Sequence, residues 1–211
     1  MKLLTLLFIL INSSYGSEYR ELRKKICSKK ILRECDQKVE NFLFSKIPQI
    51  ALRKNDKLII KINNGQSKQF NKNRYLIYLF KADSLIVISN AETEYTDNDY
   101  SLLNYRTGIE YKIHGVPVFS PNKEKFVTYN TFNPIMSGPR YIEIWSKLST
   151  GVFQKEWKSS LGDDGMDNVI WKNDSEIRGD RVKEIAPTRG VRFTLKKEKK
   201  WRIKLGNKYT D

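Results

Sequence analysis

The sequence contains very few of the residues on which most enzymes depend. It has one histidine, His114, and two cysteines, Cys27 and Cys35, and it lacks both the Gly-x-Ser-x-Gly nucleophile turn and glycine-rich phosphate loops. A catalytic triad needs partners that this histidine does not have, and a zinc site needs several clustered His and Cys ligands. We therefore interpret His114 as structural, and we expect no catalytic residue, no bound metal and no cofactor.

The chain also lacks an apolar run long enough to span a bilayer, which takes about 20 residues. Its apolar stretch 3–11 follows Lys2 and leads into small and polar residues up to Gly16. This pattern is typical of a secretory signal peptide, residues 1–16, cleaved between Gly16 and Ser17, and no cysteine lies at the cut to accept a lipid. The sequence thus predicts a periplasmic or secreted protein with no transmembrane segment and no lipid anchor.

Positive charge is abundant, with 39 Lys and Arg against 24 Asp and Glu, a formal net charge of +15. Such a cation attracts polyanions, although an AT-rich genome, which favours Lys, Asn and Ile, would raise the lysine content without any function. The basic residues concentrate near the C-terminus. The predicted anion-binding residues are Arg192, Lys196, Lys197, Lys199, Lys200 and Arg202. Aromatic residues alternate with them, as in nucleic-acid grooves but also as in any strand with one buried face, so we predict no specific nucleic-acid partner.

Apolar residues recur at three- and four-residue spacing from Ser17 to Phe44, which predicts helix, and Pro48 ends the pattern. In an oxidising compartment Cys27 and Cys35 are expected to form a disulfide. On one continuous helix their Cα atoms would lie roughly 12 Å apart, beyond the ~7 Å that a disulfide tolerates, so the helix must break near Ser28–Lys30. Two free thiols or an intermolecular bridge remain as alternatives. We predict a helical segment over 17–48.

Everything after Pro48 indicates β-structure. Short β-branched and aromatic runs at 57–62, 75–80, 84–89 and 100–105 are separated by turn residues. Residues 100–115 align with 141–157 as strand, Thr-Gly turn and strand, and each is preceded by another pair of apolar runs. A degraded third copy covers 169–205, and the 57–70 hairpin forms half of a fourth. Four antiparallel strands every 40 to 45 residues or so is the period of a propeller blade.

One of these runs, Pro117-Val-Phe-Ser-Pro-Asn-Lys-Glu-Lys-Phe, resembles the phrase that opens a blade in Tol-type and other WD-like periplasmic propellers. The order of Thr-Gly, Phe-Ser-Pro, Ile-x-Ile-Trp and Glu-Trp motifs also resembles a set of uncharacterised exported bacterial proteins. The resemblance implies a mainly β fold: an antiparallel β-repeat over 49–211, a small or open propeller-like array, fronted by the disulfide-clipped helical hairpin. Closed propellers have about four to eight blades, so the array stays open or forms a homodimer.

Function is predicted less directly. The leading hypothesis is a non-enzymatic binding module of the bacterial envelope that contacts an unknown envelope protein through its loops. The long segment 130–140 and the acidic loop 91–99 are the loops in question, and apolar side chains would anchor the partner there. The predicted partner-binding residues are Phe132, Ile135, Met136 and Arg140. The alternative is electrostatic binding of an anionic envelope polymer or lipid surface through the basic C-terminal region.

A third hypothesis is an envelope glycan hydrolase that uses loop carboxylates such as Glu94 and Asp164. One acidic group contains Glu92, Glu94, Asp97 and Asp99, and another contains Asp163, Asp164 and Asp167. Hard cations prefer such oxygen-rich loops, but neither group has the spacing of the known calcium loop. We therefore interpret both groups as solvated turns.

Overall fold

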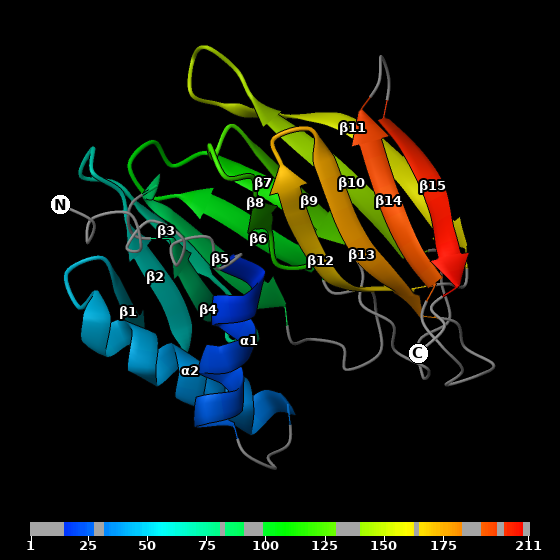
Figure 1. Ribbon diagram of the computed structural model, residues 1–211. Coiled ribbons are helices and arrows are strands. Elements are labelled where there is room, and N and C mark those ends of the chain that lie inside the picture. The colour runs from blue at the N-terminus through cyan, green and yellow to red at the C-terminus, as the bar shows by residue number, and fades with distance from the viewer. Residues whose placement is uncertain are drawn as a thin grey trace, which may run out of the picture. The chain divides into compact units, whose positions relative to one another are not determined.

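The computed structural model describes residues 15–27, 32–80, 83–90, 99–129, 140–162, 165–182, 191–197 and 201–208 (Figure 1). The chain divides into two compact units, an N-terminal unit of Tyr19–Val116 and a C-terminal unit that contains Pro117–Asp211. Residues 1–14 of the predicted signal peptide lie outside the described ranges. No helix in the described part of the chain is long and apolar enough to cross a membrane. The predicted domain limits of 17–48 and 49–211 stay predictions.

Two helices open the described chain. Helix α1 spans Tyr15–Ile26, with the predicted cleavage site in its first turn, and α2 spans Leu32–Lys46. The disulfide between Cys27 and Cys35 is present, and its Cα atoms lie 5.2 Å apart. The predicted disulfide is therefore confirmed. Helix α1 ends at Ile26 and α2 begins at Leu32, while residues 28–30, where the helix break is predicted, lie outside the described residues. Helix α2 ends two residues before Pro48, because the residue before a proline avoids the α region.

The helix pair packs on the first two sheets of the N-terminal unit. Buried apolar residues recur every four positions along one face of α2, at Cys35, Val39 and Leu43, and Ile47 continues the spacing just after the helix. They share one hydrophobic core with strand residues that include Leu58, Ile60, Leu76, Ile86 and Leu103. Burial of this apolar face holds α2 against the strands, since about 25 cal/mol is gained for each Å² removed from water.

The strands of the N-terminal unit form two antiparallel sheets. Sheet A contains β1 (Ala51–Lys54), β2 (Lys57–Lys61) and β3 (Ser67–Phe70), in the order β1-β2-β3. Sheet B contains β4 (Arg74–Phe80), β5 (Leu85–Asn90), β6 (Asp99–Asn104) and β7 (Glu110–His114), in the order β4-β5-β6-β7. Each strand pairs with its neighbour in the sequence.

The C-terminal unit repeats this arrangement twice. Sheet C contains β8 (Val118–Phe119), β9 (Lys125–Tyr129), β10 (Arg140–Lys147) and β11 (Phe153–Gly162). Sheet D contains β12 (Gly165–Asn173), β13 (Glu176–Val182), β14 (Val191–Lys197) and β15 (Trp201–Lys208). One core joins the two sheets and includes Val127, Ile142 and Ile144 of sheet C with Val169, Trp171 and Ile177 of sheet D.

The mainly β fold class and the repeat predicted from the sequence are confirmed. The aligned segments 100–115 and 141–157 form the equivalent pairs β6–β7 and β10–β11. Their Thr-Gly turns also match, since Gly108 and Gly151 have φ angles of +76° and +81°, a left-handed conformation that glycine adopts without a Cβ clash. The 57–70 hairpin belongs to the three-stranded sheet A. Four-stranded meanders of this kind are the blades of propellers. The open or homodimeric arrangement expected for the array stays a prediction.

Candidate functional site

Many of the residues predicted to act at a site lie outside the described residues. These include the loop residues Phe132, Ile135 and Met136, the acidic residues Glu92, Glu94, Asp97, Asp163 and Asp164, and the lysines Lys199 and Lys200. Arg140 begins β10, Asp99 begins β6, and Asp167 lies in β12. The proposed contact of the 130–140 loop with a protein partner therefore stays a prediction. His114 ends β7 and is half-buried.

The backbone of sheet D brings three of the six predicted anion-binding residues together, namely Arg192, Lys196 and Arg202. In its register Lys196 of β14 lies opposite Arg202 of β15, and Thr194 lies opposite Lys204. On the other side of β14, Lys196 lies opposite Glu176 and Arg192 opposite Asp180. Alternate residues of a strand share a face, so Arg192, Lys196, Arg202 and Lys204 occupy one face of the sheet.

This face is the one directed away from the core, as the side chains of β12 and β13 show. Ile170 and Arg178 lie opposite each other in the register and continue the row of Thr194 and Lys204. Ile170 is 44% exposed and the Arg178 side chain is 40% exposed. Trp171 and Ile177, which lie opposite each other on the other face, are buried in the core shared with sheet C. We call the exposed side the outer face of sheet D.

Lys197 is the exception among the predicted residues. Its partner in the register is Trp201, and it shares a face with Phe193 and Leu195 rather than with Lys196. The register thus separates Lys197 from the basic group on the outer face of sheet D.

The acidic residues of the outer face are concentrated on β12 and β13. Glu176 accepts a hydrogen bond from Arg178 Nε at 3.3 Å and lies 3.7 Å from Lys172 Nζ. Asp180 accepts a hydrogen bond from Asn168 at 2.9 Å. The third acidic position is Asp167, opposite Asp180. The rows on β14 and β15 carry basic residues and Thr194, so positive charge increases from β12 toward β15.

Three buried or partly buried carboxylates stand out elsewhere, and sequence reasoning found none of them. Glu40 of α2 is 1% exposed, and both of its oxygens accept hydrogen bonds from Arg53 of β1 at 2.8 Å. Its Oε1 also accepts the backbone N–H of Leu76 at 3.0 Å. Such bidentate pairing fixes the carboxylate in place, so Glu40 connects α2 to sheets A and B.

Glu110 lies in a network between sheets A and B. Lys68 of β3 lies 3.1 Å from its Oε2, while Lys112 at 2.9 Å and the Ser101 hydroxyl at 2.6 Å donate to its Oε1. Burial alone would raise the pKa of Glu110, but the hydrogen bonds from Ser101, Lys112 and Lys68 and the charge of Lys112 outweigh it and lower the pKa to about 2.

This network also contains a serine beside a lysine, a pairing found in some hydrolases. Lys112 Nζ donates to Ser101 Oγ at 3.1 Å, and Ser101 in turn donates to the Glu110 carboxylate. A nucleophilic serine needs a base that takes its proton, and here the lysine is a donor and the serine is buried. The arrangement therefore stabilises the ionised Glu110 and does not activate Ser101.

Glu143 of β10 is the third such carboxylate, with 0% exposure. Lys155 Nζ lies 2.6 Å from its Oε1 and Lys158 Nζ lies 3.7 Å from the same atom. The indole N–H of Trp145 donates to Oε2 at 3.3 Å. Lys155 also lies 5.0 Å from the centre of the Trp145 ring, a cation–π contact. The lysines of β11 thus neutralise a charge buried on the neighbouring strand.

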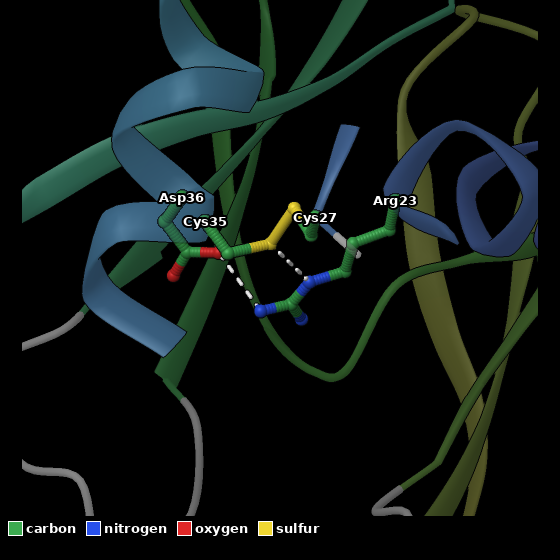
Figure 2. Close-up of a disulfide and its surroundings, with 4 residues drawn as sticks. All are labelled: Arg23, Cys27, Cys35 and Asp36. Atoms are coloured by element: carbon green, nitrogen blue, oxygen red, sulfur yellow. Dashed lines mark hydrogen bonds and ion pairs between the residues drawn. A yellow bond between two sulfur atoms is a disulfide. The ribbon is translucent and has the colours of Figure 1, made fainter. Parts of the chain in front are cut away.

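The disulfide has a polar neighbour of its own (Figure 2). Arg23 of α1 donates from Nε to Cys35 Sγ at 3.2 Å, and its Nη2 lies 3.1 Å from Asp36 Oδ1. Burial raises the pKa of Asp36 and the charge of Arg23 opposes that rise, while the nearby Glu40 adds to it. In the part of the chain that the structure describes, no group of three or more His, Cys, Asp or Glu side chains is placed to hold a metal ion.

The chain was compared with protein families, curated proteins and solved structures. No family model matches the chain, and no curated protein matches it. Among solved structures, the chain is similar to the crystal structure of TolB from Acinetobacter baumannii, with 16% identity and a TM-score of 0.37. The match covers 74% of this chain and 40% of the TolB chain, so this chain spans well under half of that protein.

Proposed function

We propose that this chain is an exported, non-enzymatic binding module of the bacterial envelope, and that it binds an anionic polymer or lipid surface through the outer face of sheet D. The observation that carries the proposal is the register of β14 and β15. It places Lys196 directly opposite Arg202, with Lys204 in the next row of the same face and Arg192 in the row after that. The export step rests on the signal peptide predicted for residues 1–16.

The closely spaced basic residues of β14 and β15 are expected to repel one another. Opposite residues of neighbouring strands lie about 5 Å apart, and alternate residues of one strand about 7 Å apart. Like charges at such distances destabilise a sheet. Glu176 and Asp180 balance the charge on one side of β14, whereas β15 is the last strand in the order of sheet D and, among the described strands, pairs with β14 alone. A ligand with closely spaced negative groups would relieve the repulsion around Arg202 and Lys204.

The shape of the region supports the same ligand class. A four-stranded sheet presents a broad face, which matches repeated phosphate or carboxylate groups better than a single small molecule. Each Lys or Arg near an anionic membrane surface contributes about 1 kcal/mol of attraction. The carboxylates Glu40, Glu110 and Glu143 already have cationic partners in Arg53, Lys68 and Lys155, an observation that favours structural over catalytic roles.

The test compares binding of residues 17–211 to phosphatidylglycerol-containing vesicles, to neutral phosphatidylcholine vesicles and to immobilised heparin. Measurements are made at about 0.1 M and about 1 M salt, between which the screening length falls from about 10 Å to about 3 Å. We expect binding to the anionic probes at low salt and its loss at high salt. Preference for vesicles over heparin would identify a lipid surface as the target, and the reverse would identify a polymer.

A matched pair of variants locates the binding face. K196Q/R202Q removes two charges from the outer face of sheet D and should weaken binding about 30-fold at low salt. K57Q/K61Q removes two exposed charges from β2, in the other unit, and should change affinity less than the first variant. Equal weakening by both variants would show that net charge, not this face, causes binding. Capture of an envelope protein with equal strength at both salts would favour the loop 130–140 instead.

A further inference from the structure

The two sulfurs of the disulfide lie in different surroundings. Cys35 is 2% exposed and lies in the first turn of α2, which begins at Leu32. Cys27 follows the last residue of α1, Ile26, and is only partly buried. An incoming reagent therefore has easier access to the Cys27 sulfur than to the Cys35 sulfur.

The same asymmetry holds for charge. Arg23 Nε points to Cys35 Sγ at 3.2 Å, and Figure 2 shows the guanidinium between that sulfur and the Asp36 carboxylate. A guanidinium beside a cysteine stabilises its thiolate, and the start of a helix adds partial positive charge in the same sense. Asp36 and Glu40 on α2 act in the opposite sense, but the 3.1 Å pair with Asp36 also fixes the orientation of Arg23 toward the sulfur.

From these two asymmetries we propose that the disulfide is exchangeable and that Cys27 is a thiol-modification site. The reagent is a thiolate, either of a small thiol or of a protein cysteine. It attacks Cys27 Sγ, a new S–S bond forms between the reagent and Cys27, and the Cys27–Cys35 bond breaks. The electron pair of the broken bond goes to Cys35, which leaves as a thiolate beside Arg23. The incoming sulfur is thereby oxidised and Cys35 is reduced.

The fold tolerates this step. Leu22 and Ile26 of α1 pack against the core of the N-terminal unit, and Arg23 pairs with Asp36 independently of the S–S bond. Helix α1 therefore keeps noncovalent contacts with α2 after exchange. A second thiolate that attacks the reagent sulfur then releases Cys27 as a free thiolate, and the reagent leaves as a disulfide.

The experiment treats the oxidised chain with reduced glutathione in one arm and with reduced thioredoxin lacking its resolving cysteine in the other. Acid quenching is followed by iodoacetamide alkylation and peptide mass spectrometry. We expect the mixed disulfide on Cys27 and the alkyl group on Cys35. Adducts in both arms mean that small thiols and protein thiols both exchange with the disulfide. An adduct in one arm alone identifies which of these two kinds of thiol is the reagent. Adducts on Cys35, an even distribution, or no reaction in either arm overturns the proposal.

Two variants separate the role of Arg23 from that of charge in general. R23Q should slow exchange about fivefold and make the adducts more evenly distributed, because the leaving thiolate loses its cationic neighbour. K24Q removes the same charge from the next residue of α1, which pairs with the exposed Glu21 at 3.0 Å, and should leave rate and adduct position unchanged. Equal effects of the two variants would also overturn the proposal. If R23Q fails to fold, the position of the adduct in the native chain still tests whether the reagent attacks Cys27.

Discussion

The guanidinium of Arg53 donates to both carboxylate oxygens of Glu40, Nε to Oε2 and Nη2 to Oε1, each at 2.8 Å. Arg53 also donates to the backbone carbonyl of Arg74 at 2.8 Å, while Glu40 accepts from Leu76. One pair of side chains thus satisfies backbone groups at the start of β4 and connects this strand to α2 and β1. The relationship makes the pair the main polar connection among the elements of the N-terminal unit.

Replacement of Arg53 by Met should therefore destabilise the protein strongly. It leaves Glu40 buried without its counter-charge, a situation that costs about 3–5 kcal/mol. Urea unfolding of R53M, E40M and the double variant would show whether removal of both charges restores part of the loss, as we expect. The exposed pair Lys24–Glu21 supplies the control, because K24Q should change stability by no more than about 1 kcal/mol. A loss in R53M no larger than in K24Q would contradict the structural role.

The Glu110 network predicts a specific acid sensitivity. The pKa of Glu110 is lowered in the folded protein to about 2 from 4.5, so its stabilising contribution is complete above about pH 4.5 and is lost as the pH falls toward 2. E110Q should be less stable than the native chain at pH 7, and the difference should shrink between pH 4.5 and pH 2. The pKa of Asp36 is raised in the folded protein, so protonation of Asp36 at low pH favours the folded state. The loss of stability at low pH should therefore persist in D36N.

Lys123 adopts a conformation that favours glycine. Its φ angle is +59°, in the turn between β8 and β9, and L-residues pay about 1–2 kcal/mol in this left-handed conformation. Asn122 supports the turn by accepting from the N–H of Glu124 at 3.0 Å. K123G should raise stability by about 0.5–1 kcal/mol after the greater freedom of the unfolded chain is counted. S149G, in an exposed turn without a positive φ, is the matched control and should lower stability; a gain there as large as in K123G would disprove the explanation.

Trp171 connects sheets C and D through a hydrogen bond from its indole nitrogen to the Val118 carbonyl at 2.8 Å. W171F keeps an aromatic ring but removes the donor, so the carbonyl loses a buried partner at a cost of about 1–3 kcal/mol. Thermal unfolding would measure the loss. W157F changes a partly buried tryptophan beside the same core and should cost less. An unchanged melting temperature in W171F would show that the indole bond does not contribute to stability.

Local patterns predicted much of the fold. The spacing of Cys27 and Cys35 required a helix break, and the Thr-Gly motifs marked matching turns at Gly108 and Gly151, because such features depend on neighbouring residues alone. The pair Glu40–Arg53 could not be predicted, since it depends on how α2 packs on strands that lie 13 and 36 residues away in the sequence. Tertiary packing decides which carboxylate is buried, and the hydrophobic periodicity of the sequence does not indicate which one it is.

The candidate site on sheet D could be predicted from the sequence in part. Arg192, Lys196 and Arg202 were named from composition, and the register of sheet D brings them to one face. Lys197 was grouped with them although it follows Phe193 and Leu195 at two-residue spacing. Strand alternation already places Lys197 on the face of those apolar residues, so this separation was present in the sequence and was missed.

Each of the four sheets pairs strands that follow one another along the chain, without a crossover. The mean sequence separation of strand contacts is therefore small for a mainly β protein, and low contact order is associated with fast folding. Hairpins can form from short closures before the elements of a unit dock. The distant link from Glu40 to Leu76 belongs to that later step, so a substitution at Glu40 should accelerate unfolding more than it slows folding.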